Sequence, residues 1–152
     1  MVEATQEYPD FINLGIVSNA RDEVLLIRRV KEEKGYEGET LRWAFPGGKQ
    51  RKGESREDCV RREVLAETGY DVRPIQQISI RSHPQFPVIV VYHRCELNSE
   101  EPVAPPGQPH EVAEVRWVKP AEIFQLITTN LDPDVKRTLG LFGGGAGRGA
   151  AG

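Results

Sequence analysis

Short apolar runs alternate with polar and glycine-rich segments along the chain. Apolar residues dominate 11–17 and 24–27, and the turn-forming residues 18–22 lie between them. Two apolar runs joined in this way predict a β-hairpin. Residues 31–42 are polar and broken by glycine, so we expect a mobile surface loop there. A short strand over 42–45 is predicted to follow, ended by a Pro-Gly-Gly sequence.

Three further strands are predicted downstream, over residues 75–81, 88–97 and 112–118. The β-branched run that begins at Val88 indicates a central strand, buried on both faces. A proline-rich loop over residues 101–111 separates the last two of these strands.

One helix is predicted strongly, over residues 55–69. Ser55 is a good N-cap residue, and Gly69 is the residue type expected just past a helix C-terminus. Pro120 and the Asp132-Pro133 pair are expected to open two shorter helices. Strands interleaved with two or three helices predict an α+β domain.

Glu63 and Glu67 occupy unusual positions on the predicted helix. Because successive residues rotate by about 100° around a helix axis, the two carboxylates share one face, flanked by apolar residues such as Val60 and Val64. Partly buried carboxylates one turn apart repel each other and lose hydration unless a cation or basic partner neutralises them. Hard carboxylate oxygens suit Mg²⁺, or Mn²⁺. An ordinary solvated pair of glutamates is the alternative interpretation.

Composition narrows the class of protein. With 152 residues, 38% hydrophobic and 28% charged, and a formal net charge of -3, the chain is expected to be one soluble domain over residues 1–141. A protein that binds duplex nucleic acid would usually be more basic.

Residues 1–10 do not resemble a secretory signal, and no apolar run is long enough to span a membrane. Cys59 and Cys95 lack zinc-site spacing, which favours a reducing, cytoplasmic setting. Residues 142–152 are glycine-rich and expected to be disordered.

The spacing around the two glutamates resembles the Nudix box. The family's pattern is G-x5-E-x7-R-E-U-x-E-E-x-G-U, in which U is a bulky apolar residue, and this chain reads G-x5-E-x7-R-E-V-L-A-E-T-G-Y. Its matching fixed positions are Gly48, Glu54, Arg62, Glu63, Glu67 and Gly69. Ala66 replaces the first glutamate of the family's E-E pair, a departure that bears on how many metal ions are held.

The resemblance implies a Nudix-type α/β/α sandwich, with a mixed β-sheet between helices. It also implies a Mg²⁺-dependent hydrolase in which water cleaves the pyrophosphate of a nucleoside diphosphate linked to another moiety. This agrees with the acidic helix, because acidic side chains can bind a polyanionic pyrophosphate only through bridging cations.

A small chain with FPGGK before the box most resembles the nucleoside triphosphate pyrophosphohydrolases. Such an enzyme converts a triphosphate, modified or not, to the monophosphate and pyrophosphate. Hydrolases of ADP-ribose or dinucleoside polyphosphates, and a nucleotide-binding module without catalysis, stay open as alternatives, because a shared catalytic helix does not distinguish them. The oligomeric state is also open.

The family's metal site maps onto five residues of this chain. Glu63 and Glu67 are the implied ligands, joined by the backbone carbonyl of Gly47. Glu54 is implied as a further or supporting ligand. Arg62 is expected to orient the acidic groups through an ion pair.

The attacking water needs a base, which in this family is a helix glutamate or one from a loop before a late strand. Glu111 is the preferred loop candidate because it lies at a loop-strand junction. Glu114 is the second candidate, and strand alternation points it the opposite way.

Substrate contacts are predicted outside the helix. Lys49, in the basic loop before the helix, and Arg28, at the end of the first hairpin, are expected to attract phosphate. Of the pair Arg28 and Arg29, one is expected to face the substrate. Phe86 is the candidate for stacking on a base, whereas Trp43 is expected to pack in the core.

Overall fold

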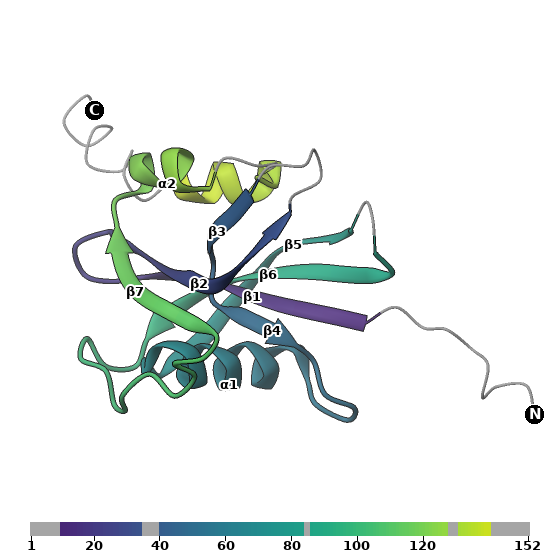
Figure 1. Cartoon of the computed structure of the whole chain (residues 1–152), viewed down its shortest axis with the longest axis horizontal. Helices are drawn as coiled ribbons and strands as arrows, with labels where there is room; N and C mark the ends of the chain where they lie inside the picture. The colour runs from purple at the N-terminus through teal and green to yellow at the C-terminus, as the bar shows by residue number, and fades with distance from the viewer. Residues whose placement is uncertain (1–9, 35–39, 84–85, 128–130, 141–152) are drawn as a thin grey trace, which may run out of the picture.

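The computed structural model describes residues 10–34, 40–83, 86–127 and 131–140. In this part of the chain one seven-stranded sheet is covered by helices on both faces (Figure 1). The strands are β1 (Asp10–Ser18), β2 (Val24–Lys34), β3 (Thr40–Ala44), β4 (Gly47–Lys49), β5 (Val72–Ser82), β6 (Val88–Leu97) and β7 (Val112–Val118). The helices are α1 (Arg56–Thr68), α2 (Pro120–Leu126) and a further helical segment over residues 133–140.

The sheet is mixed, as predicted, and β1 lies at its centre. Its main path runs β3-β2-β1-β6-β5, with β4 paired to β1 and β7 paired to β2. β1 and β6 are parallel over their whole length, whereas the other pairs are antiparallel. The β-branched run of β6 therefore lies between two strands, which confirms its predicted central position.

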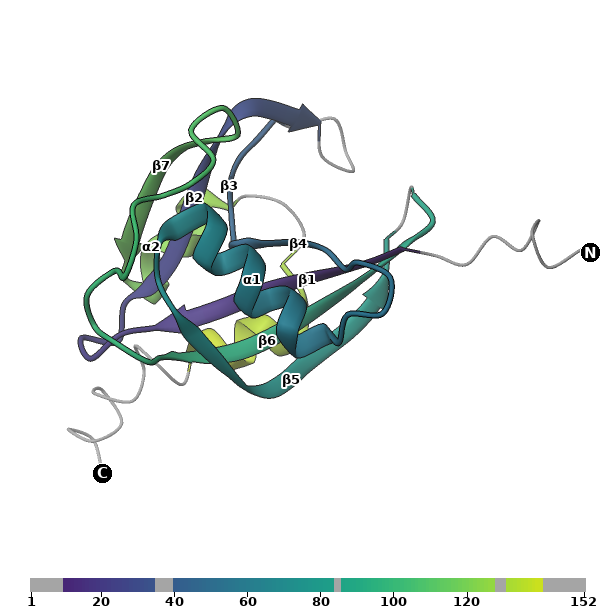
Figure 2. The same cartoon turned by 90° about the horizontal axis from the view of Figure 1, so that it is seen from below.

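Two apolar cores attach the helices to opposite faces of the sheet. Neighbouring residues of one strand point to opposite faces, so Ile16 and Val17 of β1 belong to different cores. The core under α1 contains Val17, Leu25, Val60, Val64, Val72 and Cys95. The core on the other face includes Ile16, Leu26, Tyr92, Ile123, Val135 and Leu139. Figure 2 shows α1 crossing its face of the sheet, so the predicted sandwich is confirmed.

The ends of α1 follow the predicted capping rules. Ser55 Oγ accepts a hydrogen bond from the Asp58 N–H at 3.0 Å. Gly69 adopts φ 83°, and its N–H donates to the Leu65 carbonyl. A Cβ on Gly69 would lie 2.0 Å from the Ala104 carbonyl oxygen. Glycine is therefore required there by both the backbone conformation and the close contact.

Two local predictions were wrong. Residues 31–34 and 40–41 were assigned to a polar loop, but they belong to β2 and β3, whose pairing includes a register shift. Residues 47–49 were expected only to end a strand, but they pair with β1 as β4. In both places backbone pairing forms strands without an apolar pattern in the sequence.

Some predictions concern segments outside the described residues. The predicted mobile loop retains only residues 35–39 between β2 and β3, and these are not described. The glycine-rich tail over 142–152 also lies outside the described residues. Within the described ranges, no helix has the length and apolar character needed to cross a membrane.

Candidate active site

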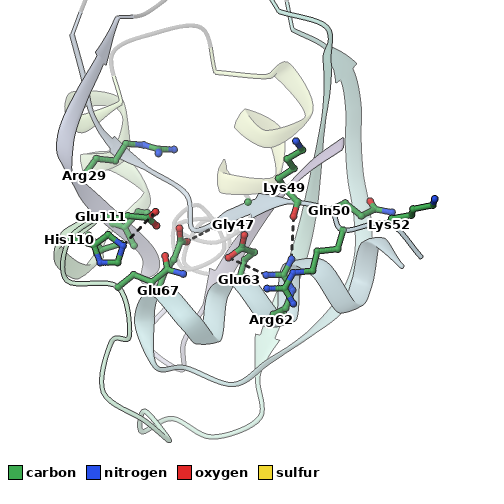
Figure 3. A pocket seen from close by; sticks show the side chains of 15 residues that line it. Arg29, Gly47, Lys49, Gln50, Lys52, Arg62, Glu63, Glu67, His110 and Glu111 are labelled. Atoms are coloured by element: carbon green, nitrogen blue, oxygen red, sulfur yellow. Dashed lines mark hydrogen bonds and ion pairs between the residues drawn. The ribbon is translucent and has the colours of Figure 1, made fainter. Parts of the chain in front are cut away.

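The start of β4 holds the carboxylate of Glu67. The Gly47 N–H donates to Glu67 Oε1 at 2.8 Å (Figure 3). Glu67 is only 8% exposed, and burial raises its pKa to about 7, although the Gly47 hydrogen bond acts in the opposite direction. Among the described residues, no hydrogen bond is made to the second carboxylate oxygen. Glu67 is therefore a desolvated acid with one oxygen available to a cation.

Glu63 lies one helical turn earlier, and both carboxylates are on the same face of α1, as helical rotation predicts (Figure 3). Its side chain packs against Gly48, where a Cβ would lie 2.1 Å from Glu63 Oε2. Burial is the main reason that the pKa of Glu63 is raised, and Arg62 opposes this shift. A side chain at position 48 would therefore displace the Glu63 carboxylate.

Arg62 connects the loop before α1 to the acidic face. Its Nε and Nη2 donate to the two carboxylate oxygens of Glu54 at 2.7 and 3.0 Å. Nη2 also donates to the Lys49 carbonyl at 3.2 Å, and Nη1 lies 3.6 Å from Glu63 Oε1. Arg62 thus orients Glu63 while it holds the loop. This geometry matches the ion-pair role predicted for it.

Glu54 is fully engaged within this loop. One carboxylate oxygen also accepts the Arg51 N–H at 2.9 Å. The hydrogen bond from Arg62 is the largest cause that lowers the pKa of Glu54 to about 2. Glu54 does not line the neighbouring cleft. Of its two predicted roles, direct ligand or support, the geometry favours support.

A cleft of about 850 Å³ opens over the two helix carboxylates (Figure 3). Its acidic residues are Glu63, Glu67 and Glu111, its basic residues are Arg29, Lys49, Arg51, Lys52 and Arg62, and Ile27 and Val112 contribute apolar surface. None of the described residues that line it is Phe, Tyr or Trp. The described cleft is therefore suited to a phosphate chain more than to a nucleobase.

Glu111 reaches the cleft from the residue directly before β7. Its charge contributes to the raised pKa values of Glu63 and Glu67, so it lies within electrostatic reach of both. Glu114 instead forms ion pairs with Arg28 at 3.3 Å and Arg116 at 2.8 Å. Of the two candidate bases in the β7 region, only Glu111 lines the cleft.

The two basic residues predicted to bind phosphate are placed differently. Lys49 lines the cleft, with its Nζ 3.1 Å from Asp10 Oδ2. Arg28 does not line it, whereas Arg29 lines it together with Ile27, because residues two apart on a strand point to the same face. Of the pair Arg28 and Arg29, Arg29 is therefore the residue that lies at the cleft.

The two aromatic candidates lie outside the cleft lining. Phe86, in the connection between β5 and β6, is 59% exposed, and its ring lies 5.0 Å from that of His83. Trp43 packs against the core, and the Arg116 guanidinium lies 4.5 Å from its ring centroid. The predicted stacking contact of Phe86 with a base in this cleft is not supported by its position.

Sequence reasoning overlooked a set of polar residues next to the site. Asn13 and His93 are fully buried in β1 and β6, and Gln50 lies between Asn13 and the loop before α1. The available signal was a polar residue inside a mainly apolar strand, Asn13 in FINLGIV and His93 in VIVVYHRC. A buried polar side chain normally has a hydrogen-bonding partner, so each of these positions predicts one.

The donor set of the acidic face fits a hard divalent cation. Two desolvated carboxylates lie side by side, and a positive charge would remove the cost of ionising both. The described residues contain no cluster of three or more His, Cys, Asp or Glu side chains arranged around one metal position. Backbone, water and substrate oxygens would complete the coordination, as is usual for Mg²⁺.

Comparison with known proteins identifies the family. The sequence profile of the NUDIX domain matches residues 13–139. This chain belongs to the NUDIX family. Membership confirms the predicted enzyme class, a hydrolase that acts on pyrophosphate bonds.

Individual relatives of this Nudix hydrolase carry different names. A Bacillus subtilis (strain 168) protein called "Putative 8-oxo-dGTP diphosphatase" is 28% identical over 131 residues, which cover 86% of this chain and 78% of the relative. The NAD-capped RNA hydrolase NudC of Stutzerimonas stutzeri (strain A1501) is 34% identical over 115 residues. That match covers 74% of this chain but only 38% of NudC.

A solved structure supports the fold independently. The crystal structure of a Nudix hydrolase from Nitrosomonas europaea matches with a TM-score of 0.70 and 22% identity. The match covers 90% of this chain and 73% of the other. At this level of identity the likeness concerns the fold, and it confirms the Nudix sandwich.

Proposed function

We propose that this Nudix hydrolase is a Mg²⁺-dependent pyrophosphohydrolase of nucleoside triphosphates, with or without a modified base, and that Mn²⁺ can substitute. The products would be the nucleoside monophosphate and pyrophosphate. The observation that carries the proposal is the pair Glu63 and Glu67, two desolvated carboxylates that face a cleft with a basic rim. The Bacillus subtilis relative, named for diphosphatase activity on a modified nucleoside triphosphate, supports the substrate class.

Glu63 and Glu67 would hold the metal ion, with the Gly47 carbonyl as the third predicted ligand. When bound, the ion neutralises charge that builds up on the phosphate oxygens during cleavage. The Gly47 N–H holds one oxygen of Glu67 in place, so its carboxylate is oriented before any ligand arrives. Arg62 restrains Glu63 in a similar way from the other side.

The basic residues of the cleft would bind the phosphate chain. Arg29 enters from β2, whereas Lys49, Arg51 and Lys52 come from the segment before α1, so the two groups lie on different elements around the acidic face. A triphosphate carries more negative charge than two carboxylates can tolerate without compensation. Basic side chains on two sides of the cleft would both attract the phosphate chain of the substrate and fix its orientation.

Glu111 would accept a proton from the attacking water. It is well exposed in the cleft, and the two helix carboxylates are within its electrostatic reach. Among the described residues, no Arg or Lys forms an ion pair with Glu111. Its carboxylate can therefore take a proton as water adds to phosphorus. His110 Nε2 lies 3.9 Å from Glu111 Oε1.

A substrate panel with identification of both products tests this proposal. The panel contains several nucleoside triphosphates, among them 8-oxo-dGTP. We expect these triphosphates to be cleaved fastest and to give the monophosphate and pyrophosphate. ADP-ribose, dinucleoside polyphosphates and NAD-capped RNA serve as the competing substrates. Faster cleavage of one of these would overturn the triphosphate assignment, and nucleotide binding without turnover would favour a sensor module.

A further inference from the structure

A chain of buried polar groups crosses the sheet toward the active-site loop. His93 on β6 is 1% exposed, and Asn13 on β1 is fully buried. His93 Nε2 lies 2.8 Å from Asn13 Oδ1, and Asn13 Nδ2 donates to Gln50 Oε1 at 3.0 Å. Gln50 Nε2 then donates to the Glu54 carbonyl at 2.8 Å. Apolar residues would fill a sheet interior without the desolvation cost that these groups carry.

The hydrogen bonds between these buried polar groups all run in one direction. Because the Glu54 carbonyl can only accept, Gln50 must present its amide nitrogen to it and its oxygen to Asn13. Asn13 must then turn its own oxygen to His93, which acts as the donor through Nε2–H. Each group therefore fixes the orientation of the next. A buried series of hydrogen bonds of this kind favours a single geometry.

The backbone of β1 supports the same segment. Asn13 lies opposite Gly48 in the β1–β4 register, and the Gln50 N–H donates to the Phe11 carbonyl at 2.8 Å. Gly48 is the residue against which the Glu63 carboxylate packs. Asn13 therefore lies directly behind the acidic face, and its side chain continues the attachment one residue beyond the strand, at Gln50.

We propose that Asn13 and His93 are positioning residues for catalysis. Through Gln50 they set the turn over residues 50–54, so that Glu54 meets the Arg62 guanidinium and Arg62 remains beside Glu63. Asn13 and His93 do not line the cleft, so their effect on turnover is transmitted through neighbouring residues. The activity part of this inference rests on the proposed hydrolase function, but the structural part does not.

The first test measures turnover in variants that interrupt this series of hydrogen bonds at different residues. Asn13→Leu and His93→Leu remove buried partners, and Gln50→Met removes both amide contacts at a partly exposed position where folding is less at risk. We expect kcat at saturating Mg²⁺ and substrate to fall about 10- to 100-fold, with KM changed much less. His93→Gln keeps an amide donor near Nε2 and should restore most of kcat.

Ser79→Ala is the matched control. Ser79 Oγ donates to Asp132 Oδ2 at 2.8 Å in a buried pair outside the cleft, so its loss also removes one buried hydrogen bond. Ser79→Ala should lower thermal stability but leave kcat unchanged. Equal kcat in Asn13→Leu, Gln50→Met and Ser79→Ala, measured while all are folded, would overturn the positioning role.

Hydrogen–deuterium exchange tests the same claim without turnover. The amides of Gln50, Arg51 and Glu54 are hydrogen bonded around the turn. Asn13→Leu and Gln50→Met should accelerate their exchange, whereas Ser79→Ala should not. If the wild-type protein cleaves no nucleotide, the proposed function fails, and this measurement still decides the inference. Unchanged exchange in both variants would contradict it.

Discussion

The Gly47 N–H lies 2.8 Å from Glu67 Oε1, and this hydrogen bond joins the start of β4 to the last turn of α1. It satisfies one oxygen of a buried acid but does not compensate for its loss of hydration, since the pKa of Glu67 stays raised to about 7. The fold therefore keeps an acid at this position at a cost in stability. That cost disappears if a cation binds.

The first prediction concerns the stability of the metal-free protein. An acid whose pKa is higher in the folded state than in the unfolded chain favours folding below its unfolded value of 4.5, and this advantage is lost as pH rises through about 7. Glu67→Gln mimics the protonated acid at every pH. Urea unfolding with EDTA should show wild type losing about 3 kcal/mol relative to Glu67→Gln between pH 4.5 and 8. A constant difference would contradict the burial of Glu67.

The second prediction is that Mg²⁺ stabilises the protein more at high pH. The metal must displace the proton from Glu67, so binding is weaker at pH 6 than at pH 8. Increasing Mg²⁺ should therefore raise the Tm of wild type more at pH 8 than at pH 6, as measured by thermal unfolding. NaCl at matched ionic strength is the control, and a larger Mg²⁺ effect at pH 6 would count against Glu67 as a ligand.

The helix and its site were predictable because their signals are local. Ser55 and Gly69 define the two ends of α1, and the helical period alone places Glu63 beside Glu67. β6 and β7 also had the predicted bounds, because their apolar runs are flanked by polar segments. These features depend on residues close together in the sequence.

The remaining features depend on pairing between distant segments. β4 is glycine-rich and becomes a strand only because β1 offers it a partner. Arg29 rather than Arg28 faces the cleft because β2 continues past Ile27, and it does so by pairing with β3 and β7. The contact between Asn13 and Gln50 spans 37 positions of the sequence, so no local pattern identifies it.

The third prediction concerns the fork between Arg62 and Glu54. Lysine cannot reproduce two parallel hydrogen bonds to a carboxylate, so Arg62→Lys should release Glu54 and loosen Glu63. We expect kcat/KM to fall about 10- to 100-fold. Arg61→Lys is the matched control, because Arg61 makes a similar fork to Asp71 outside the cleft. Equal losses in the two variants would argue against a specific role for Arg62.

The fourth prediction concerns the contact between Gly48 and Glu63. In Gly48→Ala the new methyl group would lie 2.1 Å from Glu63 Oε2, and the flexible end of the glutamate side chain would move away. The fold should survive, with a Tm close to that of wild type, while Mg²⁺-dependent turnover falls sharply. Gly140→Ala, where no atom lies within 4 Å of the added Cβ, is the control and should be fully active. Normal turnover in Gly48→Ala would show that the position of Glu63 is unimportant.

The central claim is that Glu63 and Glu67 carry metal-dependent cleavage of a pyrophosphate bond. Its most direct test is turnover of a nucleoside triphosphate by wild type and Glu67→Gln, each with Mg²⁺ and with EDTA. Glutamine preserves the acceptor for the Gly47 N–H, so the variant should fold normally. We predict Mg²⁺-dependent release of monophosphate and pyrophosphate by wild type, and turnover reduced about 1,000-fold or more in Glu67→Gln. Near-normal turnover by the folded variant would contradict the claim.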